Sequence, residues 1–302
     1  MDQDYQLKHK MKVAQNFELE GKLLHAAQIY NQIIQEYPDY VEVYFNISNL
    51  YEHMGNIIPA LELLKSYLEN NPDNKDIRLF LGQYLLRNSK WEEAINIFSF
   101  ILPEDEPIVA FFVGYAHFML EEYELAKINL DNFISVENKS ELIQEANIYL
   151  AKICLKMNDY ENALLYAKKA DVLYSNFWEL NQIYAETYYS LGMYAHAVSP
   201  VEKAIMLNPS EPSPYETAGR IYLKLGDYSK AEKYFLKYIE TIEDASSDIY
   251  AKLAEACLKG EKPKEALAYF DIAIKLDPEN KTALAGKNKA AYILNNNMVS
   301  DG

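Results

Sequence analysis

The sequence predicts an all-α fold, a solenoid of stacked helical hairpins, from two repeating columns of residues and the turns between them. An alanine returns eight times at intervals of 32 to 37 residues, a period typical of helical repeats. We call these residues the alanine column: Ala26, Ala60, Ala94, Ala126, Ala163, Ala197, Ala231 and Ala266. A stack of repeats builds an extended surface by addition, so the sequence favours binding over catalysis.

A second column of small residues stands twelve positions before the alanines. Small side chains on two facing helices let their backbones approach closely. Apolar residues three, four and seven positions away complete two amphipathic helices in each segment. Glycines such as Gly55 and Gly226 separate the two helices, and prolines such as Pro38 and Pro209 end the second one. The small column consists of Ala14, Ser48, Gly82, Gly114, Ala151, Ala185, Gly219 and Ala254.

These columns resemble the tetratricopeptide repeat (TPR) family. The resemblance covers residues 7 to 280 and is clearest at Tyr184, Ala185, Tyr188, Gly192, Ala197, Ala204 and Pro209. It implies a right-handed superhelix of eight helix-turn-helix repeats that bind ligands along their first helices, on the concave side. Pro200 lies inside a second helix, where we expect a tolerated kink, with a hinge as the alternative.

The resemblance also sets the expected boundaries along the chain. We expect an N-terminal tail over residues 1–6, a capping helix over 281–296 and a flexible tail over 297–302. Between them we expect repeats at 7–40, 41–74, 75–106, 107–143, 144–177, 178–211, 212–246 and 247–280.

Composition predicts a cytoplasmic protein that binds neither nucleic acids nor membranes. The chain has 29 basic and 45 acidic residues, a net charge of −16. Residues 1–211 hold 16 of the basic and 31 of the acidic residues, so the acidity lies in that part. A potential of this sign repels phosphate backbones and anionic lipids. We find neither a membrane-length apolar run nor a signal peptide in the sequence.

No sequence motif predicts catalysis, a metal site or a cofactor. The chain lacks a glycine-rich phosphate loop, a paired Cys-x-x-Cys, a His-Glu-x-x-His helix and a Gly-x-Ser-x-Gly elbow. Cys154 and Cys257 occupy packed positions of two separate repeats, which predicts reduced thiols in the core. We therefore expect a protein that is not an enzyme.

An aromatic patch on the first helices of repeats three to five is the main candidate site. Phe80, Phe112 and Tyr149 have an alternative role in ordinary packing. Phe111 and Tyr115 stand one helical turn apart, and we expect them to point into the groove and hold an apolar anchor residue of an extended peptide.

Polar residues at the two ends of the groove are further candidates. Asn46 and Asn49 can hydrogen-bond a peptide backbone, and Arg220 and Lys252 can meet an acidic group near repeats seven and eight. Such charge rows on helices are more often merely solvated. Chaperone-binding TPR proteins carry a carboxylate clamp, of which only the middle element, Asn46, is matched here.

Taken together, the residues and the resemblance predict an adaptor or assembly scaffold for a partner protein or peptide. The alternative is a self-associating scaffold that buries the aromatic patch in a homo-oligomer or against its own terminus.

Overall fold

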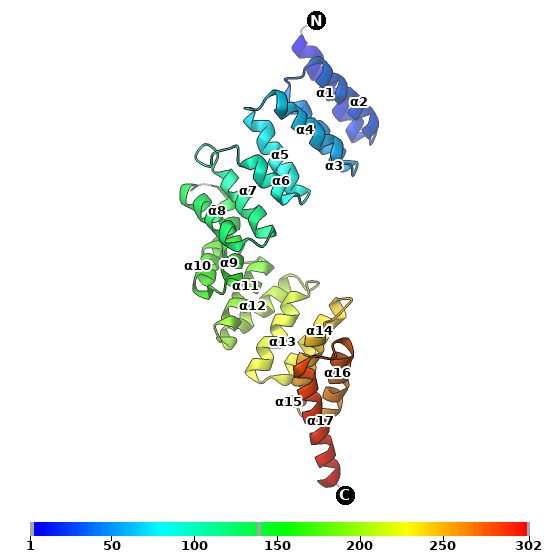
Figure 1. Cartoon of the computed structure of the whole chain (residues 1–302), viewed down its shortest axis with the longest axis vertical. Helices are drawn as coiled ribbons and strands as arrows, with labels where there is room; N and C mark the ends of the chain where they lie inside the picture. The colour runs from blue at the N-terminus through cyan, green and yellow to red at the C-terminus, as the bar shows by residue number, and fades with distance from the viewer. Residues whose placement is uncertain (1–2, 138–139, 301–302) are drawn as a thin grey trace. The chain divides into compact units, whose positions relative to one another are not determined.

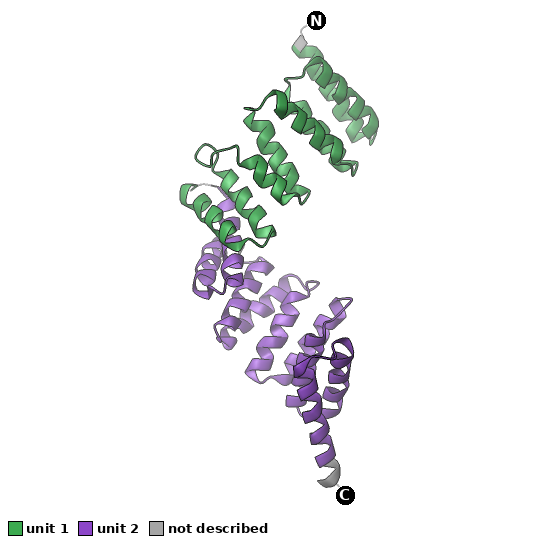
Figure 2. Cartoon of the chain, viewed as in Figure 1, with its two compact units in different colours: residues 1–138 green, residues 139–302 purple. Residues whose placement is uncertain are grey.

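The computed structural model describes residues 3–137 and 140–300, and this part of the chain is built from seventeen α-helices without a strand (Figure 1). The chain divides into two compact units, residues 1–138 and 139–302 (Figure 2). The first unit contains α1 (Gln3–Leu19), α2 (Leu23–Glu36), α3 (Val41–His53), α4 (Ile58–Asn70), α5 (Lys75–Arg87), α6 (Trp91–Phe98), α7 (Ile108–Met119) and α8 (Tyr123–Val136).

The second unit contains four more helical pairs and one additional helix. Its helices are α9 (Leu142–Lys156), α10 (Tyr160–Tyr174), α11 (Trp178–Ser190), α12 (Tyr194–Leu207), α13 (Ser213–Leu225), α14 (Tyr228–Thr241), α15 (Ser247–Lys259), α16 (Pro263–Leu276) and α17 (Lys281–Ser300). The prediction of an all-α solenoid is confirmed.

Within each unit, an odd-numbered first helix packs on the even-numbered second helix that follows it, and each pair packs on the next. First helices of successive pairs also contact one another, as α3 does with α5, α5 with α7, α9 with α11, and α11 with α13. Among the described residues, no two second helices pack to a comparable extent. The first helices therefore form the more closely spaced face of each unit.

The two columns of small residues meet where the helices of a pair cross. All sixteen residues of the two columns are buried. A Cβ added to one of the column glycines would come within 2.4 to 2.7 Å of a large side chain on the second helix, sixteen residues later. These pairs are Gly82 with Phe98, Gly114 with Leu130, and Gly219 with Phe235.

The second-helix residue sixteen positions after the small residue varies in size. Ala151 and Ala185 have a larger side chain than glycine, and the residues sixteen positions later are the smaller Ala167 and Val201. Phe270 follows Ala254 at the same interval, and its ring lies against Gly286 of α17, where an added Cβ would be only 2.1 Å away. Tyr30 and Leu64, both fully buried, follow Ala14 and Ser48 at the same interval, so alanine or serine also tolerates a large side chain there. At the glycine crossings, the close-packed side chain leaves no room for a Cβ.

A second recurring contact fixes the turn before a first helix. Tyr44, Arg78, Asn181 and Tyr215 each donate a side-chain hydrogen bond to the backbone carbonyl six residues earlier. Three of the four carbonyls belong to prolines, namely Pro38, Pro72 and Pro209. Three chemically different side chains therefore satisfy an equivalent turn carbonyl, which would otherwise lack a helical donor.

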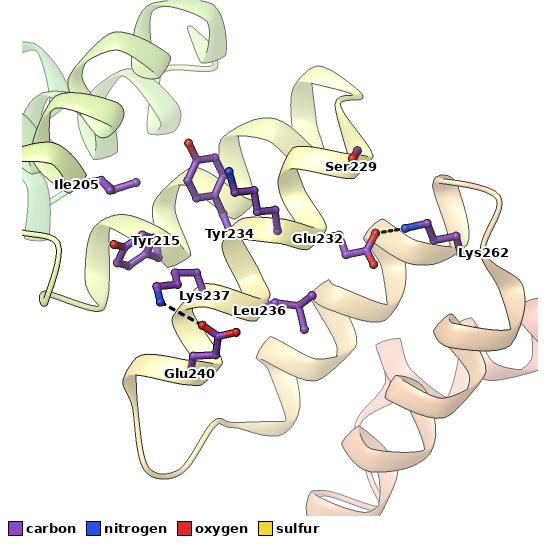
Figure 3. A pocket seen from close by; sticks show the side chains of 10 residues that line it. Ile205, Tyr215, Ser229, Glu232, Tyr234, Leu236, Lys237, Glu240 and Lys262 are labelled. Carbon is purple, nitrogen blue, oxygen red and sulfur yellow. Dashed lines mark hydrogen bonds and ion pairs between the residues drawn. The ribbon is translucent and has the colours of Figure 1, made fainter.

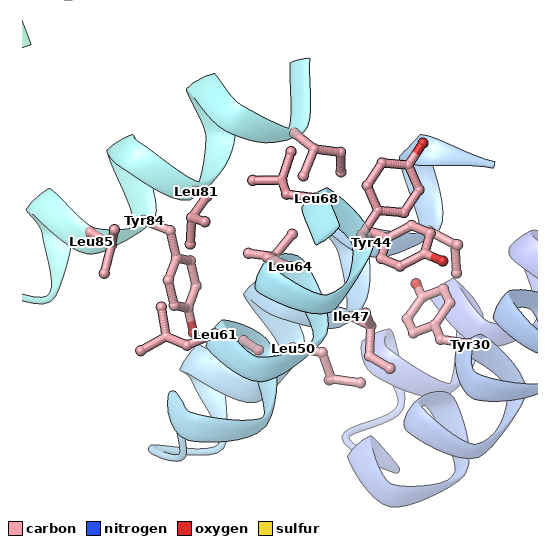
Figure 4. Close-up of a cluster of buried hydrophobic side chains, with 14 of the residues drawn as sticks. Tyr30, Tyr44, Ile47, Leu50, Leu61, Leu64, Leu68, Leu81, Tyr84 and Leu85 are labelled. Carbon is pink, nitrogen blue, oxygen red and sulfur yellow. The ribbon is translucent and has the colours of Figure 1, made fainter. Parts of the chain in front are cut away.

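The core of the first unit is continuous from one helical pair to the next. In the first unit, Tyr30 of α2, Ile47 of α3, Leu64 of α4, and Leu81 and Tyr84 of α5 belong to one buried cluster (Figure 4). All five side chains are fully buried. Each pair thereby buries an apolar face that it could not bury alone.

Helix extends into both segments that were expected to be tails. Helix α1 begins at Gln3, and an ion pair of 2.7 Å between Asp4 and Lys8, one turn apart, supports its first turn. Helix α17 continues past residue 296 to Ser300, since no glycine or proline follows Gly286 in it. Residues 1–2 and 301–302 of these tails lie outside the described part.

Two further expectations concern points inside the chain. Pro200 lies within α12, whose helical structure continues through it. A hinge at Pro200 stays the alternative to the expected tolerated kink. The limits of the eight repeats stay a prediction, because helix ends do not define repeat boundaries.

We expect Gly219→Ala to lower the free energy of unfolding by about 1–3 kcal/mol, because the new Cβ would lie 2.7 Å from the Phe235 ring. Adding Phe235→Leu should recover much of this loss. Urea denaturation followed by circular dichroism measures both. Alanine favours a helix over glycine by about 1 kcal/mol, and the overpacking works against this gain, so a raised stability of the single variant would contradict the packing described for this crossing.

Candidate functional site

In each unit, the first-helix side chains that are not fully buried make contacts between successive helical pairs. We call these side chains the first-helix face. In the first unit, Arg87 at the end of α5 is its central residue. The Arg87 guanidinium donates to the side-chain oxygens of Asn49 at 3.2 Å and Glu52 at 3.1 Å, both on α3. It also lies 5.8 Å from the centroid of the Phe80 ring.

Arg87 therefore brings together two residues that were predicted separately, Asn49 and Phe80. The Phe80 ring also packs on Phe45 of α3, with centroids 4.6 Å apart. Sequence reasoning missed Arg87, although Glu52 precedes it by 35 residues, one repeat period, and has the opposite charge. Asn46 lies nearby on α3, half-buried, and its Nδ2 is shielded from solvent without a hydrogen-bond partner among the described residues.

The expectation that Phe111 points into the groove is wrong. This side chain is only 6% exposed, and its ring lies 5.4 Å from Phe133 of α8, in the core of its own helical pair. The equivalent residues of other repeats, Met11 and Ile148, are buried too. Apolar residues at this position in all of the first five repeats were the available sign that it belongs to the core.

The neighbouring aromatic residues of α7 pack towards the preceding helical pair. Phe112 stacks on Phe98 of α6 at 5.5 Å, and Tyr115 meets Trp91 of α6 edge-on at 5.7 Å. Both remain half-buried. Packing thus accounts for much of Phe112, while a binding role for Tyr115 stays a prediction.

In the second unit, the predicted residue Tyr149 lines a cavity of about 250 Å³. The cavity is enclosed by Glu145, Ile148, Tyr149 and Lys152 of α9, Phe177 directly before α11, and Glu179 of α11. The Lys152 ammonium forms an ion pair of 2.5 Å with Glu179 and lies 5.5 Å from the Tyr149 ring centroid. Burial raises the pKa of the Glu145 carboxyl, and the Lys152 charge offsets part of this rise.

The two predicted basic residues of the second unit share one acidic partner. Glu216 of α13 lies 3.2 Å from the Lys252 ammonium and 3.9 Å from the Arg220 guanidinium. The guanidinium also lies 4.4 Å from the centroid of the Tyr189 ring. Part of the positive charge offered to an acidic partner is therefore already neutralised within the chain, and binding there stays a prediction. Glu216 was not identified from the sequence.

An open cleft of about 720 Å³ runs along α14, a second helix (Figure 3). Ion pairs of 2.7 Å between Lys262 and Glu232, and of 3.1 Å between Lys237 and Glu240, occupy its rim. Exposed pairs of this kind contribute little and are typical of a solvated helix surface. The cleft therefore serves as a contrast to the first-helix face.

The remaining chemistry of the described residues is limited. They contain no group of three or more histidine, cysteine or acidic side chains placed to hold a metal ion. None of the described helices has the length and apolar character needed to cross a membrane. Cys154 and Cys257 are buried cysteines, and burial raises the pKa of Cys257 to about 12, which keeps its thiol protonated at neutral pH.

Stacked helical pairs with small residues at each crossing define a helix-turn-helix repeat protein. A tetratricopeptide repeat family model matches residues 54–106 and 216–281, and a model of anaphase-promoting complex, cyclosome, subunit 3 matches residues 156–238. The chain is a tetratricopeptide repeat protein.

Similar proteins span much of the chain at low identity. TPR repeat-containing protein MJ1428 of Methanocaldococcus jannaschii is 26% identical over 273 residues, which make up 86% of this chain and 38% of that protein. The chain thus spans well under half of this relative.

Solved structures show the same fold. The crystal structure of the APC/C hetero-tetramer Cut9–Hcn1 matches 89% of this chain and 52% of the other chain, with a TM-score of 0.60 at 15% identity. The structure of pilF of Pseudomonas aeruginosa matches 71% of this chain and 96% of its own, with a TM-score of 0.59 at 16% identity.

We expect Phe111→Ala to lower the free energy of unfolding by about 3–5 kcal/mol, because it removes a ring from a packed core. Met119→Ala on the same helix is the control, since Met119 is 41% exposed and its truncation should cost about 0.5 kcal/mol or less. Thermal and urea denaturation measure both variants. Wild-type stability of Phe111→Ala would instead fit a side chain that projects into a groove.

Proposed function

We propose that this protein is a non-enzymatic interaction scaffold whose first-helix face binds an extended segment of a partner protein. The observation that carries the proposal is that inter-repeat contacts hold half-exposed aromatic and charged side chains in place within each unit. Arg87 is the fixed point in the first unit, and Lys152 and Arg220 are the fixed points in the second. A preorganised surface loses less side-chain entropy when it binds a partner.

The spacing of the helices suits an extended peptide. Packed helices lie roughly 8–10 Å apart, and an extended chain advances about 3.3 Å per residue. One helical pair therefore corresponds to about three residues of a bound segment, and successive first helices can each contact one of its side chains. The family supports this mode, and Cut9 is named as part of a hetero-tetramer. We also place the protein in the cytoplasm, where its two buried cysteines would stay reduced.

Self-association through the aromatic patch is the weaker proposal. Phe111 is already buried within its own helical pair, and Phe112 stacks on α6. These contacts leave less aromatic surface for a second copy or a terminus to cover.

Selection from a random peptide library displayed on phage, with the purified chain as bait, tests the proposed function. We expect enriched peptides to bind the double variant Arg87→Ala/Tyr149→Ala at least tenfold more weakly, because loss of one packed side chain typically removes more than 1.4 kcal/mol. Fluorescence polarisation with the enriched peptides measures the affinities, and circular dichroism verifies the fold of each variant.

The matched control is Lys233→Ala/Lys237→Ala on α14, in the cleft of Figure 3. These substitutions should leave the affinity unchanged. The proposal would be refuted if peptides bound the first-helix variant as tightly as the wild type but did not bind the α14 variant. That result would place the binding surface on the second helices.

A further inference from the structure

The cavity between α9 and α11 combines a small volume with an excess of negative charge. Its volume of about 250 Å³ is below the roughly 300–1,000 Å³ of pockets for small-molecule ligands, and so suits a single side chain. It lies on the first-helix face, because its lining residues come from two successive first helices and from Phe177 directly before α11.

The charges in the cavity do not balance. Lys152 forms an ion pair with Glu179, so its ammonium is already in use. Glu145 has no hydrogen bond or ion pair within the described residues, although burial raises the pKa of its carboxyl. The three charged side chains of the cavity carry a formal charge of −1 together, and the carboxylate of Glu145 accounts for it.

The position of Glu145 explains why the charge is tolerated but does not neutralise it. Glu145 lies in the first turn of α9, where the helix dipole favours a negative charge. A carboxylate that is partly removed from water still gains most from an opposite charge with hydrogen-bond donors. A cation entering the cavity would supply both.

The walls of the cavity suit the aliphatic part of a long basic side chain. Ile148 is 4% exposed, and Tyr149 and Phe177 are half-buried. Arginine and lysine pack their methylene groups along apolar surface while the charged head reaches a polar group. Aromatic rings also attract such cations, arginine in particular.

We propose that this cavity receives a basic side chain, preferably arginine, of the partner segment bound on the first-helix face, with Glu145 as its ion-pair partner. The inference rests on the proposed function and names the partner's chemistry. The acidic balance of residues 1–211, with 16 basic against 31 acidic residues, favours the same kind of segment.

Peptides selected from the library provide the direct test. Each basic residue of an enriched peptide is replaced in turn by citrulline, which keeps the shape of arginine but not its charge. At one position the replacement should weaken binding to the wild type at least tenfold, and it should change binding to Glu145→Gln less than twofold. Glu186→Gln is the matched control, because this α11 glutamate accepts a hydrogen bond of 2.8 Å from Gln182 and lies outside the cavity.

The outcomes separate the inference from the proposed function. Enriched peptides without a basic residue, or an arginine preference that survives in Glu145→Gln, overturn the inference and leave the scaffold function intact. If the library yields no binder, the proposed function fails. A titration with N-acetylarginine amide then tests whether the cavity binds a basic side chain.

In that titration the ¹³C-methyl signal of Ile148, assigned from an Ile148→Val variant, is the reporter. N-acetylarginine amide should shift this signal in the wild type but not in Glu145→Gln, and N-acetylcitrulline amide should not shift it in the wild type. An equal response of the wild type and Glu145→Gln overturns the inference.

Discussion

The structure depends on how closely the two helices of each pair can approach at their crossing. A buried alanine and a buried small residue meet there in every pair, and at the glycine crossings the large side chain of the second helix leaves no room for a Cβ on the opposite residue. Phe235 against Gly219 shows how little room is left. Because interiors are close-packed, such a fit sets the distance and angle between the helices. Repetition of the same fit along the chain places the first helices next to one another within each unit.

The first-helix face follows from this repetition. A residue and its equivalent one repeat later lie on neighbouring first helices, so polar contacts recur at the same interval. Glu52 and Arg87 are 35 residues apart, as are Gln182 and Thr217, and both pairs are in contact. Arg87, Lys152 and Lys252 are each paired with a glutamate of a neighbouring first helix, which leaves these charges less capacity to attract a partner. A charge without such a pair, such as that of Glu145, then becomes the more specific feature for recognition.

Sequence predicted the crossings well because they depend on residue size at a fixed period. It failed for Phe111, whose position in the repeat points towards neighbouring helices and not into open space. That direction depends on how pairs pack on each other, which one repeat taken alone does not reveal. Arg87 and Glu216 were missed because an ion pair depends on side-chain conformations across two repeats.

Hydrogen–deuterium exchange of the chain, alone and with a selected peptide, tests most directly whether the packed crossings leave the first helices as the binding surface. Bound peptide should slow exchange in first helices, with α9 and α11 among them, and leave the paired second helices α10 and α12 near their unbound rates. Protection confined to second helices, or spread evenly over both helices of each pair, would contradict the account.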